Sequence, residues 1–596
     1  MVLLSILCIP FNILSFIFSV IVAYGPKKSV YAKLKADQRG HVAAARSDIL
    51  ANLDTKSVAK IIAAIQGPSP VRSLREAIQT NAVTADQVRS YLSAAAILAE
   101  DELTCLADTS LLHAPRTTPA AAASSSSGPL GGIPVSVKDN FHLPGNVSTI
   151  GVGKNCEPVS TVAGAVAALE AAGAVPFVKT NVSQTLMLPE SANPVYGVAC
   201  NPFNVKRTPG GSSGGEGALV GAGASVVGLG TDIGGSVRIP AHFCGVVGFK
   251  PTSSRQTGMG LTKAFYGQEA IASSVGFLSQ RVEGVRTAAE AVCNNSVDPT
   301  QAPIPFDSAK ASPTRRLRVG YYDYDQWFPA SAALQRAVRE TVDALEEHGE
   351  SVDVKPIEPI DTKALIGLYY GLVSADGLKL VRETIWGEQL VYQLRPTLLL
   401  GIVPSFVRTL VAFVLRLLGQ TEKAWVVSHL GEKRVCDVWT MQHARANMRR
   451  DWANHLEVND VDVVLCPTLS FPAFVHGGAT NLLPSLSYTF LANLLDLPAG
   501  SVPVTTVTAA DAHSAPPRPA GFAGPAAQQE VDSEGLPVGV QLVGRPHDDE
   551  TVLCAMDRVE RALDAATSSH VRCVPDLRRR IQATIMTAVK AGRKGI

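Results

Sequence analysis

The sequence predicts an α/β protein in which a sheet is covered by helices on both faces. Apolar runs of strand length alternate along the chain with segments whose apolar residues recur at helical spacing. The composition allows a large buried core, since 46% of the 596 residues are hydrophobic and 18% are charged. The formal net charge is +1, so the charge balance does not point to nucleic acid as a partner.

The N-terminal segment is predicted to be a single-pass transmembrane anchor. Residues 1–24 contain no charged side chain, and Val2–Ala23 is long enough to cross a bilayer core of about 30 Å. Four lysines follow within a few residues: Lys27, Lys28, Lys33 and Lys35. The positive-inside rule then places the N-terminus outside and the bulk of the chain in the cytosol. An internal membrane is the expected location. A signal sequence is the alternative interpretation.

The first half of the chain is expected to begin with helices. Residues 25–69 are predicted to form a linker and N-terminal helices, and the helical pattern continues to residue 105, where Thr84-Ala85-Asp86-Gln87 is a capping box. The Ala- and Ser-rich stretch 115–129 is a low-complexity loop. An alternation follows, with strand Ile133–Val137, helix Thr161–Ala172 and strand Ala174–Val178.

A second alternation covers the C-terminal half. Its predicted strands are Leu317–Tyr321, Val352–Pro356, Val461–Leu465 and Pro537–Val543, and its predicted helices are Ala332–His348 and Glu550–Leu563. Residues 505–535 form an Ala- and Pro-rich insert, and 581–596 form a basic tail. The tail is expected to be an exposed helix face, with attraction to anionic lipid as the alternative.

Two glycine-rich segments carry the candidate chemistry. Pro209–Gly217 contains Ser212 and Ser213, and Gly230–Ser236 ends at a third serine. A phosphate-binding P-loop is excluded because no lysine follows these glycines. A nucleophile elbow centred on Ser213 would need a strand leading into it, and the preceding residues are turn-like. The remaining hypothesis is a relay in which both segments meet a lysine.

Lys138 is the candidate base. It ends the apolar run Ile133–Val137 and is followed by the turn-forming pair Asp139-Asn140. A lysine must be neutral to accept a proton, and burial against apolar walls lowers its pKa from the ordinary value of about 10.4. A lysine at the end of a strand is usually an exposed edge residue, so only the nearby serines make Lys138 a candidate.

Together these segments resemble the amidase signature family. The resemblance covers roughly residues 70–580, including Thr180-Asn181, Asp462–Thr468, Asn493–Pro503 and Leu536–Pro546. It implies the amidase signature fold, a large mixed β-sheet covered by helices on both faces, and the hydrolysis or transfer of amides. It also implies a catalytic domain over 70–580.

The resemblance further implies a role for each residue of the site. Ser236 would be the nucleophile, Ser212 the proton shuttle and Lys138 the base, with a cis peptide bond between Gly211 and Ser212. The backbone N–H groups of Ile233, Gly234, Gly235 and Ser236 would form the oxyanion hole. Ser213, Asp232 and Arg238 are expected to support these loops, and His242 to be structural. Leu186 is the candidate for the acyl channel, with an ordinary core leucine as the alternative.

A second apolar segment narrows the substrate class. Pro396–Leu418 is rich in leucine and phenylalanine but contains Arg408 and Arg416. An in-plane amphipathic helix pair fits best, with its apolar side in the acyl boundary and its arginines at the headgroups. A core helix and a membrane span are the alternatives. The family's lipid-cleaving members have such a membrane-binding cap, which here would occupy 396–430.

The resemblance, together with the two apolar segments, therefore implies a membrane-bound serine amidase that cleaves fatty acid amides, such as N-acylethanolamines and primary amides, to free acid and amine through an acyl-enzyme. It predicts no metal and no organic cofactor, membrane lipid as a partner, and leaves a homodimer open. One alternative is a general amidase for small amides, or a glutamine-dependent amidotransferase subunit of the same family. Another is a membrane scaffold with an inactive site, which the joint presence of Lys138, Ser212 and Ser236 disfavours.

Overall fold

The computed structural model describes residues 28–113, 128–295, 297–312, 315–512, 514, 516–566 and 573–596. The predicted anchor 1–24 and most of the stretch 115–129 lie outside the described residues. Within the described part of the chain, no single helix is long and apolar enough to cross a bilayer. The helical segments Tyr392–Ile402 and Ser405–Leu417 reach that length and apolarity only together, and they are bent by 114° at the break between them.

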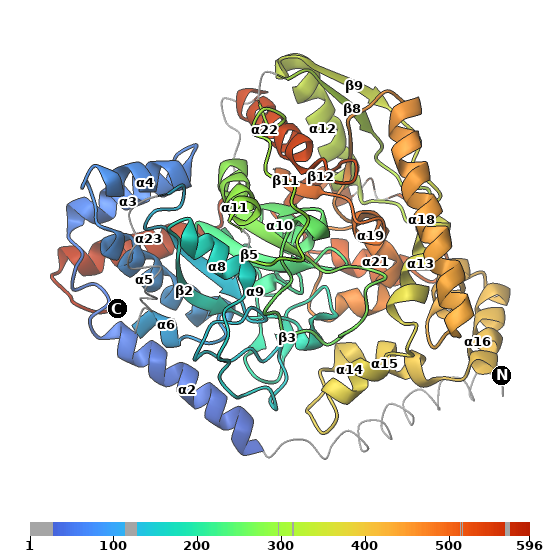
Figure 1. Cartoon of the computed structure of the whole chain (residues 1–596), viewed down its shortest axis with the longest axis horizontal. Helices are drawn as coiled ribbons and strands as arrows, with labels where there is room; N and C mark the ends of the chain where they lie inside the picture. The colour runs from blue at the N-terminus through green and yellow to red at the C-terminus, as the bar shows by residue number, and fades with distance from the viewer. Residues whose placement is uncertain are drawn as a thin grey trace.

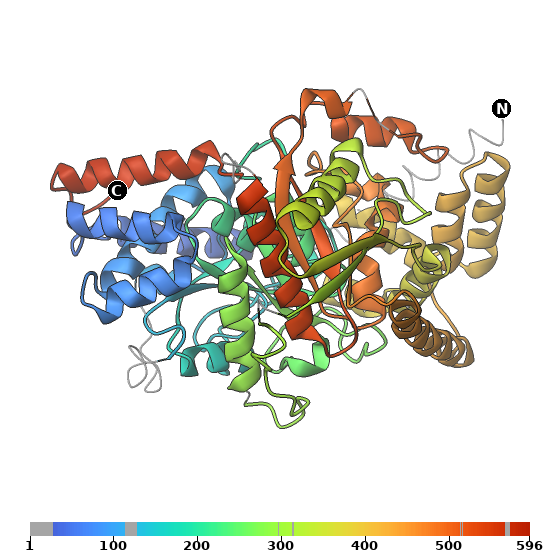
Figure 2. The same ribbon diagram turned by 90° about the horizontal axis from the view of Figure 1, so that it is seen from above.

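A ten-stranded mixed sheet forms the centre of the molecule (Figures 1 and 2). In spatial order its strands are β2 (Val175–Thr180), β1 (Pro134–Lys138), β5 (Val227–Asp232), β7 (Ser274–Ser279), β6 (Val247–Lys250), β11 (Ala499–Thr506), β12 (Pro537–Val543), β10 (Val463–Pro467), β8 (Leu317–Tyr321) and β9 (Val352–Pro356). The strands at both edges pair in parallel, and those from β5 through β7, β6, β11 and β12 to β10 pair antiparallel. A separate two-stranded sheet pairs β3 (Ala192–Asn193) with β4 (Gly197–Val198).

Helices cover both faces of this sheet, as the sequence predicted. One face carries a row of neighbouring helices, α8 (Gly164–Ala171), α11 (Val282–Asn294), α22 (Asp549–Ala566) and α12 (Ala332–His348). The other face carries α5 (Ala85–Leu103), α9 (Gly214–Gly221), α10 (Arg238–Phe243) and α19 (Ser487–Leu494). The strands are buried on both sides because of this coverage, and β1, β5, β7, β10 and β12 are buried along their whole length.

Two helical groups lie at opposite ends of the sheet (Figure 1). One comprises α2 (Lys28–Arg46), α3 (Thr55–Gln66), α4 (Pro70–Gln79), α5, α6 (Ser110–His113) and α23 (Asp576–Lys590). The other, called the cap here, comprises α13 (Thr362–Val373), α14 (Lys379–Thr384), α15 (Arg395–Ile402), α16 (Ser405–Leu417), α17 (Thr421–His429) and α18 (Val435–Val458). The insert 505–535 contains α20 (Ala509–Ala512) and α21 (Ala523–Glu530).

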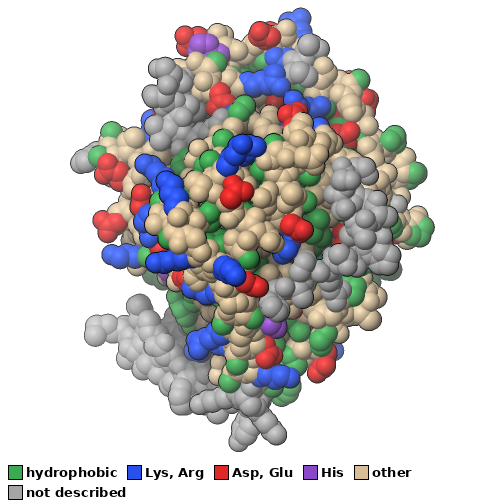
Figure 3. Space-filling view, turned by 90° about the vertical axis from the view of Figure 1, so that its left-hand side faces the viewer, with side chains coloured by type: hydrophobic (Ala, Val, Ile, Leu, Met, Phe, Trp, Pro, Cys, Tyr) green, Lys and Arg blue, Asp and Glu red, His purple; other side chains and the backbone are tan. Residues whose placement is uncertain are grey.

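The surface at the end formed by α2–α6 and α23 carries charges of both signs. Lysines and arginines are interspersed with aspartates and glutamates on this face (Figure 3). The basic C-terminal helix α23 is part of this pattern, because Arg580 forms an ion pair with Glu102 of α5 at 2.6 Å. This side of the molecule therefore shows no large field of one sign that would attract a polyelectrolyte.

Several predicted elements are confirmed within a few residues. The capping box at Thr84 begins α5, with Gln87 donating its backbone N–H to the Thr84 hydroxyl at 3.1 Å. The predicted strands and helix over 317–356 match β8, α12 and β9. The predicted helix Thr161–Ala172 is too long at its start, since α8 begins only at Gly164.

The segment 396–418 forms the bent pair α15 and α16, which requires one correction. The prediction placed both arginines at lipid headgroups, and Arg416 is exposed. Arg408 is instead buried, and its guanidinium donates to the carbonyl of Val403 and packs against Gly431. Burying its charged end at the bend satisfies a carbonyl that the helix break leaves without a helical partner.

Candidate active site

Three loops bring the candidate residues together at one edge of the sheet. Lys138 is the last residue of β1, Ser212 lies just before Ser213, the N-cap of α9, and Ser236 lies between β5 and α10. β1 and β5 are parallel neighbours, with Val137 opposite Leu229. Lys138 and the loop after β5 therefore emerge at the same edge, which is where sites form in sheets of this kind.

Lys138 is completely buried and surrounded by oxygen atoms. Its Nζ lies 2.8 Å from the Ser212 hydroxyl, 2.9 Å from the Thr231 hydroxyl and 3.2 Å from the Thr231 carbonyl. A neutral amine has two N–H donors and one lone pair, so these three oxygens suit it: the two of Thr231 can accept, and Ser212 can donate. This arrangement leaves the lone pair facing the hydroxyl from which a base would take a proton.

The electrostatics favour the neutral amine. Desolvation lowers the pKa of Lys138 from 10.5 to about 7, and the nearby carboxyl groups of Asp232, Glu216 and Asp139 only partly oppose this effect. Burial likewise raises the pKa of Glu216 to about 8. Glu216 accepts hydrogen bonds from Ser136 at 2.6 Å and Thr180 at 2.7 Å, which are neutral donors. A general base works best when its pKa lies near the working pH, and the pKa of about 7 for Lys138 meets this condition.

The two serine loops are joined through their backbones. The peptide bond between Gly211 and Ser212 is cis, as the resemblance implied. The N–H of Ser213 donates to the carbonyl of Ser236 at 3.2 Å, so Ser213 supports the loops as expected. No hydrogen bond joins the hydroxyls of Ser212 and Ser236, both of which the structure describes. Contacts of this kind between catalytic groups often tighten only in the complex with substrate.

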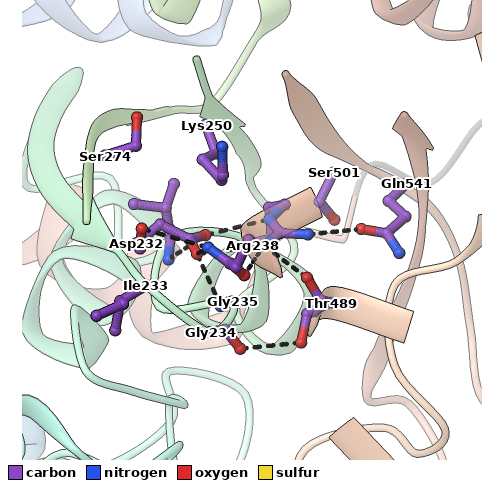
Figure 4. A network of polar contacts seen from close by, with 12 residues as sticks. Asp232, Ile233, Gly234, Gly235, Arg238, Lys250, Ser274, Thr489, Ser501 and Gln541 are labelled. Carbon is purple, nitrogen blue, oxygen red and sulfur yellow. Dashed lines mark hydrogen bonds and ion pairs between the residues drawn. The ribbon is translucent and has the colours of Figure 1, made fainter. Parts of the chain in front are cut away.

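Asp232 and Arg238 organise the loop that carries Ser236 (Figure 4). Both side chains are completely buried and form an ion pair at 3.1 Å. Although burial alone would raise it, the Arg238 guanidinium holds the pKa of Asp232 well below its usual range, with help from Lys250 and Asn493. Asp232 also accepts the N–H groups of Gly235 at 2.7 Å and Val237 at 3.1 Å. The pair therefore fixes the backbone on both sides of Ser236.

The predicted oxyanion hole needs one change. The N–H of Gly235 is already donated to Asp232, so it is committed to the loop rather than to a ligand. Among the residues that the structure describes, no hydrogen bond uses the N–H of Gly234 or of Ser236. Gly234 and Ser236 also border the adjoining cavity. These two N–H groups are better candidates for binding a negative oxygen than that of Gly235, and the N–H of Ile233, which also borders the cavity, stays part of the predicted oxyanion hole.

An apolar cavity adjoins Ser236, which is 8% exposed. Leu186 lines this cavity, as the sequence suggested for the acyl channel. Other apolar or aromatic lining residues include Ile233, Phe265, Tyr369, Leu486 and Phe490. The cavity lies between the core loops and the cap, because α13 and α15 contribute to its wall. A pocket lined in this way favours an apolar group bound beside Ser236.

Sequence reasoning missed several residues of the site. Thr231 contacts Lys138. In the sequence, only its position between Gly230 and Asp232 could have indicated a role in the site. Tyr369 and Thr489 contact the carbonyls of Ile233 and Gly234, and they come from helices far away in the sequence. His242 is structural as expected: its Nδ1 accepts the N–H of Gly539, and burial lowers its pKa to about 4.

Comparisons with known proteins agree with this geometry. Residues 86–553 match the sequence model of the family described as Amidase. Fatty-acid amide hydrolase 1 of Sus scrofa is 38% identical over 446 residues, which are 73% of this chain and 76% of that protein. Fatty acid amide hydrolase 1 of Caenorhabditis elegans is 32% identical over 450 residues, 73% of this chain and 77% of that protein.

A solved structure described as a fatty acid amide hydrolase has the same fold. It superposes with a TM-score of 0.71 and covers 91% of this chain and 97% of its own. The sequences are 23% identical in that superposition, so this match bears on the fold alone.

Proposed function

The chain belongs to the amidase family and is an amide hydrolase, and on this premise we propose that it hydrolyses fatty acid amides at a membrane surface. The single observation that carries the mechanism is the fully buried Lys138, 2.8 Å from the Ser212 hydroxyl, beside an apolar cavity bordered by Ser236. The names of the relatives from pig and nematode support fatty amides as the substrate class.

The mechanism begins with proton transfer away from the nucleophile. Lys138 takes the proton of Ser212, Ser212 takes the proton of Ser236, and the Ser236 oxygen bonds to the amide carbonyl carbon. The carbonyl oxygen becomes negative and is stabilised by the N–H groups of Gly234 and Ser236. The proton then returns through Ser212 to the amide nitrogen, the C–N bond breaks, and the amine leaves. Water hydrolyses the acyl-enzyme by the same relay.

The apolar cavity supports a long acyl chain over a small amide. An enzyme for acetamide-sized substrates or for glutamine needs polar groups or a small pocket around the acyl end. Here most of the side chains that line the cavity are apolar or aromatic, and Ser374 and Thr397 are among its few polar ones. The general amidase and the amidotransferase subunit are therefore less well supported than a lipid amidase.

A labelling experiment tests the nucleophile. A fluorophosphonate probe should label the protein, and the labelled peptide should contain Ser236. The variant S236A should lose the label and the hydrolysis of a long-chain primary amide, whereas S213A should keep the label. Competition by a long-chain amide should exceed competition by a short-chain amide. Labelling that survives in S236A, or indifference to chain length, would contradict the mechanism or the substrate class respectively.

The cap is proposed to bind membrane through the exposed side of α16. Four apolar side chains recur there at helical spacing: Phe406, Leu410, Phe413 and Leu417 are 74%, 61%, 55% and 71% exposed. Val435 and Trp439 of α18 are also exposed. Contiguous exposed apolar side chains of this kind mark interaction sites. The predicted anchor 1–24 would hold the cap near the bilayer. We keep residues 396–430 as the proposed membrane-binding part of the cap.

A comparison of two substrates tests the membrane role independently of the anchor. The variants F406D and F413D should slow hydrolysis of a long-chain amide dissolved in vesicles but leave hydrolysis of a short-chain soluble amide unchanged. V458D is the matched control, because Val458 is a highly exposed apolar residue at the other end of α18. Equal rates for F406D and V458D with vesicle substrate would exclude this face as the membrane contact.

A further inference from the structure

The loop between β5 and α10 is held by two hydroxyl groups that the mechanism does not use. The Tyr369 hydroxyl of α13 donates to the carbonyl of Ile233 at 3.1 Å. The Thr489 hydroxyl of α19 donates to the carbonyl of Gly234 at 2.9 Å, as Figure 4 shows. Both carbonyls belong to peptide groups whose N–H ends point into the nucleophile loop. The two hydroxyls therefore act on the backbone that would bind the oxyanion.

The peptide group between Ile233 and Gly234 depends on Tyr369. A peptide group is planar and trans, so fixing the direction of its carbonyl also fixes its N–H in the opposite direction. The hydroxyl of Tyr369 comes so close that a Cβ atom on Gly234 would lie 2.5 Å from it. The contact thus holds the carbonyl of Ile233 on the Tyr369 side and turns the N–H of Gly234 away from it.

The next peptide group is held more securely. Its carbonyl, that of Gly234, accepts from Thr489, and its N–H, that of Gly235, donates to Asp232 at 2.7 Å. Both ends of this group therefore have a partner, although the Thr489 hydroxyl shares its proton with the carbonyl of Leu486 at 3.0 Å, and the N–H of the group is committed to Asp232. In the preceding peptide group, between Ile233 and Gly234, only the carbonyl has a hydrogen-bond partner among the described residues, and that partner is Tyr369. Tyr369 is the contact on which the orientation of the free Gly234 N–H depends.

The same tyrosine forms part of the acyl cavity. Its ring is stacked on Phe490 with centroids 3.8 Å apart and planes 6° apart. Both rings line the cavity, together with Tyr370, which meets the ring of Tyr369 edge-on at 5.8 Å. Tyr369 is 6% exposed, so its ring has little freedom to turn away. The ring that walls the acyl chain thus carries the hydroxyl that orients the oxyanion loop.

We propose that Tyr369 is a positioning residue that orients the Gly234 N–H for oxyanion binding and ties the acyl cavity to the catalytic loop. This inference rests on the proposed function, in which Ser236 attacks and the N–H groups of Gly234 and Ser236 stabilise the negative oxygen. The developing charge exists in the transition state and not in the bound substrate. Loss of this support therefore lowers kcat rather than raising KM.

Tyr370 provides a matched control in the same helix. It too is a buried tyrosine that lines the cavity, and its hydroxyl also donates to a backbone carbonyl, that of Leu483, at 2.9 Å. Its acceptor does not belong to the nucleophile loop. The variant Y370F removes an equivalent hydrogen bond from the cavity wall, so its effect should fall mainly on KM for a long-chain amide.

The experiment compares Y369F and Y370F with a long-chain primary amide. Y369F keeps the ring and removes only the hydroxyl, and it should lower kcat about tenfold with little change in KM, the size expected for one supporting hydrogen bond. A trifluoromethyl ketone with the same acyl chain forms a tetrahedral adduct, and its affinity should fall by the same factor. A parallel thermal unfolding curve close to that of the parent chain shows that the fold is intact.

A second pair of variants covers the case in which Y369F does not fold. T489V should lower kcat only about threefold, because Asp232 still holds the neighbouring peptide group, and T489S should keep the parental kcat. Equal kcat for T489V and T489S, for Y369F and the parent, or for Y369F and Y370F would overturn the proposal. Failure of the proposed function looks different, because S236A would then remain active.

Discussion

The rate of amide hydrolysis should fall as the pH drops through about 7, because the base must be neutral. Desolvation lowers the pKa of Lys138 to about 7, and below that value the amine gains a proton and can no longer accept one from Ser212. The expected profile of kcat/KM is therefore flat above pH 8 and falls by a factor of ten per pH unit well below 7.

The size of the effect follows from the shift in pKa. With a pKa of about 7, about 90% of the chains carry a neutral Lys138 at pH 8, whereas an ordinary lysine would be neutral in about 0.3%. Burial therefore increases the competent fraction about 300-fold at this pH. Without the shift, the rising limb of the profile would lie above pH 9.

The assay is the initial rate with a long-chain primary amide in detergent between pH 5.5 and 9.5. K138A should be slower at every pH and should lose the limb near pH 7. Glu190 is the control, because burial raises its pKa to about 7 as well and it lies beside Gly211. E190Q should keep the limb. A limb that persists in K138A, or one that disappears in E190Q, would refute the assignment of the titration to Lys138.

Three further predictions concern stability and the surroundings of Lys138. K138M should raise the free energy of unfolding at pH 8 by about 2–3 kcal/mol. The reason is that a lysine in the unfolded chain keeps its proton up to about pH 10.4, whereas the buried Lys138 loses its proton near pH 7 and folding must remove it. This gain, measured by urea unfolding, should shrink as the pH rises from 8 to 10. E216Q should leave the acid limb of kcat/KM in place, because burial keeps Glu216 neutral there; a downward displacement of the limb would mean that this carboxyl is ionised. G276A should lower the free energy of unfolding by about 1–3 kcal/mol, because a Cβ at this position would lie 2.7 Å from the Phe249 carbonyl oxygen. G524A is the control: a Cβ there meets only open space, so the unfolding midpoint should stay almost unchanged.

The outer parts of the sheet could be predicted from sequence because they follow ordinary patterns. β8 and β12 consist largely of apolar and β-branched residues, and α12 and α22 are amphipathic. Each therefore shows the periodicity of its own secondary structure. The central strands β5, β7, β6 and β11 were not predicted, and glycines interrupt the apolar runs of the first three: Gly228 and Gly230 in β5, Gly276 in β7 and Gly248 in β6.

Close helix packing explains those glycines. A Cβ on Gly228 of β5 would lie 2.1 Å from the carboxylate of Glu216 in α9, and one on Gly248 of β6 would lie 2.6 Å from Ala241 in α10. These two helices begin just after Ser212 and Ser236. Glycine in the strands leaves the room that the helices need to approach the sheet closely. A strand-propensity scale treats glycine as unfavourable. It does not include the tertiary packing that makes glycine necessary at these positions.

The site was predictable where one segment supplies several groups, and not where distant helices contribute one group each. Lys138, Ser212 and Ser236 stand in recognisable segments. Tyr369 is a tyrosine in an apolar helix, and nothing in its neighbourhood distinguishes it from Tyr370. Arg408 was misplaced for a related reason, because helical spacing does not show that a bend in the chain offers a buried carbonyl to the guanidinium.

The Asp232–Arg238 pair resolves a conflict between two requirements of the site. The nucleophile loop needs a carboxylate, because Asp232 accepts two backbone N–H groups there. That carboxylate lies near Lys138 and by itself favours the charged amine, which would raise the pKa of the base. Arg238 is buried against Asp232 at 3.1 Å and offsets its charge, so the carboxylate can order the loop with less effect on the amine. The ion pair therefore allows a rigid oxyanion loop and a neutral lysine to coexist in one dry site.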